Sequence, residues 1–129
     1  MKEKHHLAAL QLAIMQVLWE RGEATVACVR KALHKTRPLA HTTIGTMLAK
    51  MERNGQVHHR VEGKFNIYRP AIQQQNVRRS MVSNLAASLF AGDVTQMVSH
   101  LLDGREVSRE ELARLKSLIR QKEAEHDGK

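Results

Sequence analysis

The hydrophobic residues of this 129-residue chain change their spacing twice along its length. Up to residue 53 they recur every three or four positions, which is the spacing of one helix face. Two short β-prone runs follow, Gln56 to Val61 and Phe65 to Arg69, and they flank Glu62-Gly63-Lys64 as the strands of a β-hairpin would. After Pro70 the helical spacing returns. The order of elements is therefore helices, a hairpin, then helices again.

Three helices are predicted before the hairpin, and each is bounded by residues that start or stop helices. The first covers residues 6–21 and ends at Gly22. The second starts at Thr25, whose hydroxyl can accept a bond from a first-turn amide, and closes before Pro38. The third runs from residue 40 or 41 to the stop signal Asn54-Gly55.

Three more helices are predicted after the hairpin, the last of them starting at the capping box Ser108 to Glu111. Their apolar stripe lies outside the first core, so it needs something to cover it. A second copy of the chain fits best, and a different protein is the alternative. The predicted dimerisation residues are Val77, Met81, Leu85, Leu89, Val98, Leu101, Leu102, Leu112, Leu115 and Ile119.

The expected fold class is mainly α with a small β-hairpin. Three helices and a hairpin make the winged form of the helix-turn-helix, in which the third helix lies across a DNA major groove. We therefore predict a winged-helix DNA-binding domain over residues 1–72. A helical dimerisation domain is predicted over residues 73–129.

The charge of the chain is divided in the same way. Residues 1–80 hold 14 Lys and Arg against 5 Asp and Glu, a net charge of +9, whereas residues 81–129 hold 7 against 8, a net charge of −1. All the excess positive charge therefore lies in the first part. This division indicates that the first part meets a polyanion, and double-stranded DNA is the expected partner.

The third helix carries the side chains that would contact DNA. With Ile44, Met47, Leu48 and Met51 facing inward, a hydroxyl-rich face points outward. Small hydroxyl and methyl groups can approach base edges closely, and cations neutralise phosphates. An ordinary polar surface helix is the alternative interpretation. The predicted DNA-binding residues are His41, Thr42, Thr43, Thr46, Lys50 and Arg53 from this helix, with Arg60 and Lys64 from the hairpin.

Other classes of function have less support. The sequence contains no phosphate loop, nucleophile elbow or His-Glu-x-x-His pattern, so we expect neither an enzyme nor a cofactor. His58-His59 is a poor chelating pair because strand neighbours point to opposite faces, and no metal site is expected. Cys28 is the only cysteine and is expected to be an incidental thiol rather than a redox switch. A metal-responsive regulator and a non-DNA interaction module remain as alternatives.

No apolar run reaches the roughly 20 residues of a membrane span, and the first residues lead into an amphipathic segment. We therefore expect no membrane insertion and a cytoplasmic location.

The chain resembles the penicillinase-repressor family (BlaI and MecI, with their copper-responsive CopY relatives) over nearly its whole length. The resemblance implies a homodimeric transcriptional repressor whose paired recognition helices read an inverted-repeat operator. It also implies that a membrane sensor with a metalloprotease domain triggers inactivation of the repressor. The motifs that carry it are Leu18-Trp19-Glu20-Arg21-Gly22 with Thr25-Val26, Ala40 to Leu48, Asn54-Gly55-Gln56-Val57, Gly63-Lys64 with Tyr68-Arg69-Pro70, and Ser108 with Glu111-Leu112.

Three positions depart from the family pattern. Antibiotic-responsive members are cut at an Asn-Phe bond, and His100-Leu101 stands at the matching position. Copper-responsive members carry a C-terminal cysteine cluster that this sequence lacks. His41 replaces the tyrosine that is common before the Thr-Thr pair, which could alter operator preference.

Overall fold

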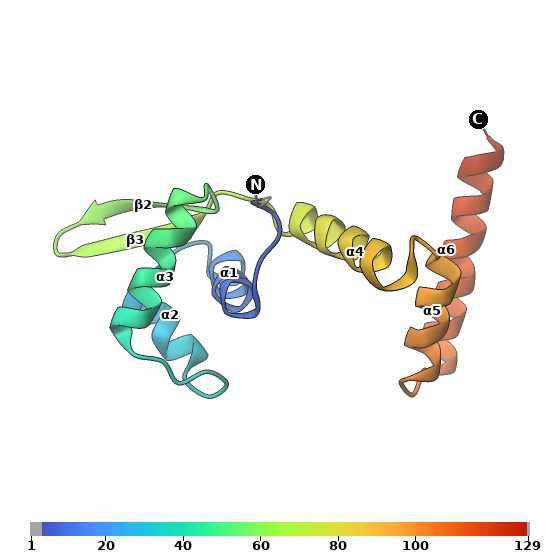
Figure 1. Cartoon of the computed structure of the whole chain (residues 1–129), viewed down its shortest axis with the longest axis horizontal. Coiled ribbons are helices and arrows are strands. Elements are labelled where there is room, and N and C mark those ends of the chain that lie inside the picture. The colour runs from blue at the N-terminus through green and yellow to red at the C-terminus, as the bar shows by residue number, and fades with distance from the viewer. Residues whose placement is uncertain (1–3, 129) are drawn as a thin grey trace. The chain divides into compact units, whose positions relative to one another are not determined.

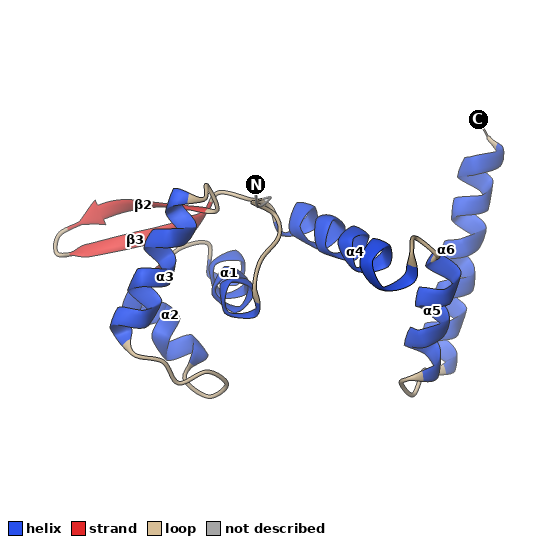
Figure 2. Cartoon of the chain, viewed as in Figure 1, coloured by secondary structure: helices blue, strands red, loops and turns tan. Residues whose placement is uncertain are grey.

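The computed structural model describes residues 4–128, and its elements follow in the order α1, β1, α2, α3, β2, β3, α4, α5, α6 (Figures 1 and 2). Contacts divide the chain into two units, one ending at Leu85 and one beginning at Ala86. The predicted fold class, mainly helical with a small β-hairpin, is confirmed. The bounds are α1 Ala9–Arg21, β1 Ala24–Thr25, α2 Val26–Leu33, α3 His41–Arg53, β2 Val57–Glu62, β3 Phe65–Pro70, α4 Gln74–Phe90, α5 Val94–Asp103 and α6 Arg109–Asp127.

The predicted helix boundaries in the first unit have a local cause in each case. Gly22 ends α1 with φ +85°, and its amide donates to the Leu18 carbonyl at 2.7 Å. The Thr25 hydroxyl accepts from the Cys28 amide at 3.1 Å, which confirms Thr25 as the N-cap of α2. α2 ends at Leu33, earlier than expected, and the chain continues in a turn in which the Thr36 and Arg37 amides both donate to the Leu33 carbonyl. α3 then begins at His41.

The hairpin is part of a three-stranded antiparallel sheet in the order β1-β3-β2. In the register of the hairpin, His59 pairs with Tyr68 and Glu62 pairs with Phe65. The short strand β1 adds Ala24 opposite Tyr68, and this strand was missed because two residues show no hydrophobic period. Since β3 is central, β2 forms a free edge of the sheet.

The core of the first unit collects one face from each helix and one face of the sheet. Ile14 and Leu18 of α1, Val29 of α2, and Ile44 and Leu48 of α3 are fully buried. From the sheet, Val57 and Tyr68 close this core. The Trp19 indole donates to the Ile72 carbonyl at 2.9 Å, so the chain before α4 is fixed to α1.

The start of α4 belongs to the same core, which revises one prediction. Val77 was predicted as a dimerisation residue, but it is 1% exposed and packs in the core of the first unit. Met81 is partly buried against this core, whereas Leu85 is 44% exposed. The predicted domain boundary at residues 72–73 precedes α4, while the division between the two compact units falls inside it.

The second unit contains the end of α4, α5 and α6. Asp93 caps α5 by accepting from the Gln96 amide at 3.0 Å, and Ser108 caps α6 by accepting from the Glu111 amide at 3.1 Å. No residue of α5 or α6 is buried. These helices therefore form regular elements without a closed core of their own. Among the described residues, no helix has the length and apolar character needed to cross a membrane.

Candidate nucleic-acid interface

α3 has two faces of opposite character. Ile44, Leu48 and Met51 are buried in the core, and Met47 is half-buried against it. The opposite face presents all the side chains of this helix that were predicted to contact DNA. His41, Thr42, Thr43, Thr46, Lys50 and Arg53 are exposed.

The charge on this face is positive. The first turn of α3 holds no acidic residue and Ala40 provides no side-chain cap, while Lys50 and Arg53 lie in the last turn. No carboxylate in the described part of the chain pairs with Lys50, Arg53 or Lys64. These three cations are therefore available to phosphates.

Glu52 of α3 holds the edge strand of the hairpin. Its carboxylate accepts from the His59 backbone amide at 3.1 Å and lies 2.7 Å from the His59 Nδ1 atom. Because a carboxylate only accepts, Nδ1 carries the proton in this pair. The His59 ring also packs on Tyr68, with ring centroids 5.4 Å apart. The recognition helix and the hairpin are thus joined by polar and aromatic contacts.

Arg60 is held on the other face of the hairpin. Its guanidinium donates to both carboxylate oxygens of Glu23 and, at 3.0 Å, to Glu62. The hydrogen bond from Arg60 holds the pKa of Glu23 below its usual range, and the two carboxylates raise the pKa of Arg60. Arg60 was predicted to neutralise phosphates, but in the structure its charge is already compensated within the chain.

Neither contact was found from the sequence. Glu52 and His59 are seven residues apart, and Glu23 and Arg60 are thirty-seven apart. Helical or strand periodicity does not connect such pairs. The packing of α3 against β2 brings Glu52 to His59, and the sheet order, in which β1 and β2 flank β3, brings Glu23 to Arg60.

A model of the family described as penicillinase repressor matches residues 7–121. The chain belongs to the penicillinase repressor family. Its members are DNA-binding transcriptional repressors, and so is this chain. The match takes in α3, the hairpin and most of α6, so it includes parts of both units.

Individual relatives agree with the family assignment. The penicillinase repressor of Bacillus licheniformis is 26% identical over 119 residues, which cover 92% of this chain and 93% of the relative. The solution structure of the DNA-binding domain of the repressor BlaI matches with a TM-score of 0.51 and 30% identity, covering 59% of this chain and 93% of that one. The complex structure of hsRosR-SG, at 15% identity and a TM-score of 0.53, covers 95% of this chain and 97% of that one and shows likeness of fold.

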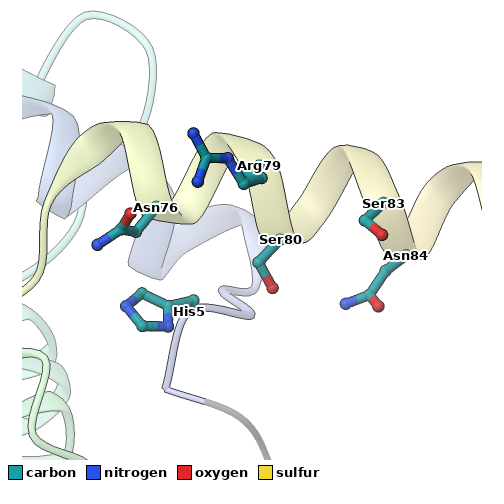
Figure 3. A pocket seen from close by; sticks show the side chains of 6 residues that line it. All are labelled: His5, Asn76, Arg79, Ser80, Ser83 and Asn84. Atoms are coloured by element: carbon teal, nitrogen blue, oxygen red, sulfur yellow. The ribbon is translucent and has the colours of Figure 1, made fainter. Parts of the chain in front are cut away.

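This penicillinase repressor family member also has a polar pocket away from α3. Figure 3 shows His5 of the N-terminal segment beside the face of α4 that carries Asn76, Ser80 and Asn84. Asn84 Nδ2 lies 3.3 Å from Nδ1 of His6. This pocket was not predicted from the sequence, because it depends on where the N-terminal segment crosses α4.

Two further sequence predictions concern reactive or metal-binding groups. Cys28 is exposed, and its hydrogen bonds with Thr25 lower the pKa of its thiol. Within residues 4–128, no three His, Cys, Asp or Glu side chains come together as metal ligands.

Proposed function

We propose that the protein represses transcription as a homodimer that places two α3 helices in successive major grooves of an inverted repeat. The observation that carries this proposal is the exposed face of α3, where three threonines and two uncompensated cations lie beside a hairpin that is fixed to the same helix. A two-fold dimer matches a two-fold operator, with half-sites about one helical turn or a multiple of it apart.

Within each half-site the side chains divide into two roles. Thr42, Thr43 and Thr46, with His41 at the start of the helix, would contact base edges and determine sequence preference. Lys50, Arg53 and Lys64 would neutralise phosphates and set the position on the duplex. Arg60 would act mainly by holding the hairpin, because Glu23 and Glu62 already compensate its charge.

The dimer part of the proposal rests on the exposed apolar side chains of α5 and α6 and of the later turns of α4. Large apolar side chains at these positions remain accessible, among them Leu89 at 67%, Leu101 at 51% and Ile119 at 57%. Leaving this area in water is unfavourable by about 25 cal/mol per Å². The proposed dimer surface comprises Met81, Leu85, Leu89, Val98, Leu101, Leu102, Leu112, Leu115 and Ile119.

Release by a membrane sensor system is the final part of this proposal, with the repressor acting in the cytoplasm where it meets DNA. The bond His100-Leu101, at the position where relatives are cut, lies inside α5. A protease could reach it only after local unfolding of that helix. The ring contact of His100 with Phe90, at 5.3 Å between centroids, would be lost in that step.

Selection of bound duplexes from a random-sequence pool, combined with sedimentation equilibrium, tests the function. The proposal predicts enrichment of an inverted repeat and a dimer at micromolar concentration. Leu101→Lys should shift the chain towards monomer, whereas Gln96→Lys, an exposed polar position on the same helix, should not. A monomeric wild type without sequence preference would contradict the proposal.

A further inference from the structure

A polar stripe runs along one face of α4. Its members recur every three or four positions, which is the spacing of neighbours on one helix face. The stripe carries one cation, two hydroxyls and two carboxamides, on Arg79, Ser80, Ser83, Asn76 and Asn84. The proposed contacts with DNA and with a second copy of the chain use none of these side chains, so the stripe has no role in the proposed function.

The N-terminal segment crosses this stripe and forms a pocket of about 400 Å³ with it. His5 provides the second wall, and Figure 3 shows Asn76 and Ser80 on the side of α4 that faces its ring. All the lining residues belong to the first unit. A pocket of this volume has room for a small molecule.

His5 is held in place through its two neighbours in the chain. On one side, the Lys4 carbonyl accepts from Nε2 of Gln56 at 3.0 Å. On the other side, Nδ1 of His6 lies 3.3 Å from Nδ2 of Asn84 on α4. These contacts fix the spacing of the two walls, so binding a ligand between them costs little ordering of the chain.

The chemistry of the lining favours an anion. Guanidinium, hydroxyl and carboxamide groups all donate hydrogen bonds, and an imidazole donates from at least one nitrogen. Among the described residues, no carboxylate and no large apolar side chain lines the pocket, and no carboxylate pairs with Arg79. A cationic or apolar ligand would find no matching group, whereas the net charge of +9 over residues 1–80 attracts an anion.

We propose that this pocket binds the phosphoryl group of a small molecule. A phosphoryl group has oxygens in several directions, so it can accept hydrogen bonds from α4 and from the N-terminal segment at once. A carboxylate is planar and has two oxygens, so it reaches fewer of these donors. Arg79 supplies the charge, and Ser80, Ser83 and His5 supply further donors. The bound group joins the N-terminal segment to α4 and thereby stabilises the first unit.

Thermal unfolding of the full chain tests this site, with inorganic phosphate, glycerol 3-phosphate and succinate as probes. Sodium chloride at matched ionic strength is the reference. Both phosphates should raise the melting temperature above the reference as their concentration increases, because a ligand that binds only the folded chain stabilises it. A larger rise with glycerol 3-phosphate than with inorganic phosphate would identify a phosphate monoester as the ligand, and the reverse would identify the free ion.

The variants locate the site on α4. Arg79→Ala should increase the phosphate concentration needed for a given rise about 10- to 100-fold, since charge-assisted hydrogen bonds are lost. Arg78→Ala is the matched control, because Arg78 is also exposed on α4 but does not line the pocket, and it should respond like the wild type. Lys50→Ala should respond like the wild type too, which separates this pocket from the cations of α3. The general effect of phosphate salts on stability acts on every variant, so the difference between variants measures the site.

Four results would overturn the inference. Equal melting temperatures in phosphate and in chloride would mean that the pocket binds no phosphate. An equal response of the wild type and Arg79→Ala, or a response lost in Lys50→Ala, would place the anion elsewhere on the chain. A larger rise with succinate than with either phosphate would make the ligand a carboxylate. If Arg79→Ala lowers the slope of log DNA affinity against log salt by about 1, the pocket holds a backbone phosphate of DNA instead of a small molecule.

Discussion

The carboxylate of Glu52 accepts a hydrogen bond from the backbone amide of His59 and contacts the His59 ring at 2.7 Å. His59 lies in β2, the edge strand of the sheet, so this carboxylate satisfies an amide that would otherwise face solvent. A side chain of the recognition helix therefore completes the sheet. The position of the β2–β3 hairpin, the wing of this fold, relative to α3 depends on this pair.

Glu52→Ala should loosen the wing without unfolding the first unit. Loss of a partly exposed hydrogen-bonded pair costs about 1 kcal/mol, since the net contribution of such bonds is small. The amide of His59 should exchange with solvent faster, as measured by hydrogen exchange, while amides of α1 keep their protection. Unchanged exchange at His59 would mean that Glu52 does not hold the strand in solution.

The Glu23–Arg60 pair makes a prediction about pH. The pKa of Glu23 lies below its ordinary value of 4.5 because Arg60 donates to the carboxylate. The contribution of this pair to stability is therefore present above pH 4.5 and lost as the pH falls through the lower folded-state pKa. An NMR titration of the Glu23 carboxyl group should give a midpoint below 4.5, which rises in Arg60→Ala and stays in place in Lys64→Ala. Equal midpoints in wild type and Arg60→Ala would exclude the pair.

Arg60 and Lys64 should differ in their contributions to DNA binding. Lys64→Ala should lower the slope of log affinity against log salt by about 1, because an uncompensated cation replaces a condensed counterion on DNA. Arg60→Ala should change this slope less, since a phosphate must compete with Glu23 and Glu62 for the guanidinium. Fluorescence anisotropy over a salt series measures both slopes. A larger change of slope for Arg60→Ala than for Lys64→Ala would mean that Glu23 and Glu62 do not compensate the charge of Arg60 when DNA is bound.

Gly45, in the middle of α3, should be replaceable by alanine with a gain in stability. A Cβ at this position meets nothing within 4 Å, and Gly is less favourable than Ala inside a helix by about 1 kcal/mol. The melting temperature of Gly45→Ala should rise by about 3 to 6 °C. Gly22 is the matched control: it also has open space, but its φ of +85° should make Gly22→Ala destabilising. A lower melting temperature for Gly45→Ala would mean that the added methyl group clashes with a neighbouring atom, which would contradict this expectation.

Apart from the two-residue strand β1, the sequence predicted the elements of the first unit because each is marked locally. Thr25, Gly22 and Asn54-Gly55 act on their own turns, and the buried residues Ile44 and Leu48 follow the helical period. Once the buried residues of α3 were predicted, the helical period also predicted which of its side chains are exposed.

What the sequence did not predict depends on residues far apart in the chain. The period of α4 places Val77 in one stripe with Leu85, but only the packed structure shows that Val77 belongs to the core. For the same reason, the phosphate-binding role predicted for Arg60 did not anticipate Glu23, which β1 brings beside it. Contacts between distant elements, rather than local pattern, determine both contacts of the hairpin: helix–strand packing for Glu52 with His59, and strand pairing for Glu23 with Arg60.

The central claim is that two copies of the chain read two half-sites on one face of the duplex. The most direct test compares affinity for the selected inverted repeat with affinity for the same repeat carrying five extra base pairs at its centre. Such an insertion rotates one half-site by about half a helical turn, because B-DNA has about 10.5 base pairs per turn. The dimer account predicts that affinity falls to that of a single half-site. Equal affinity for the two duplexes would contradict it.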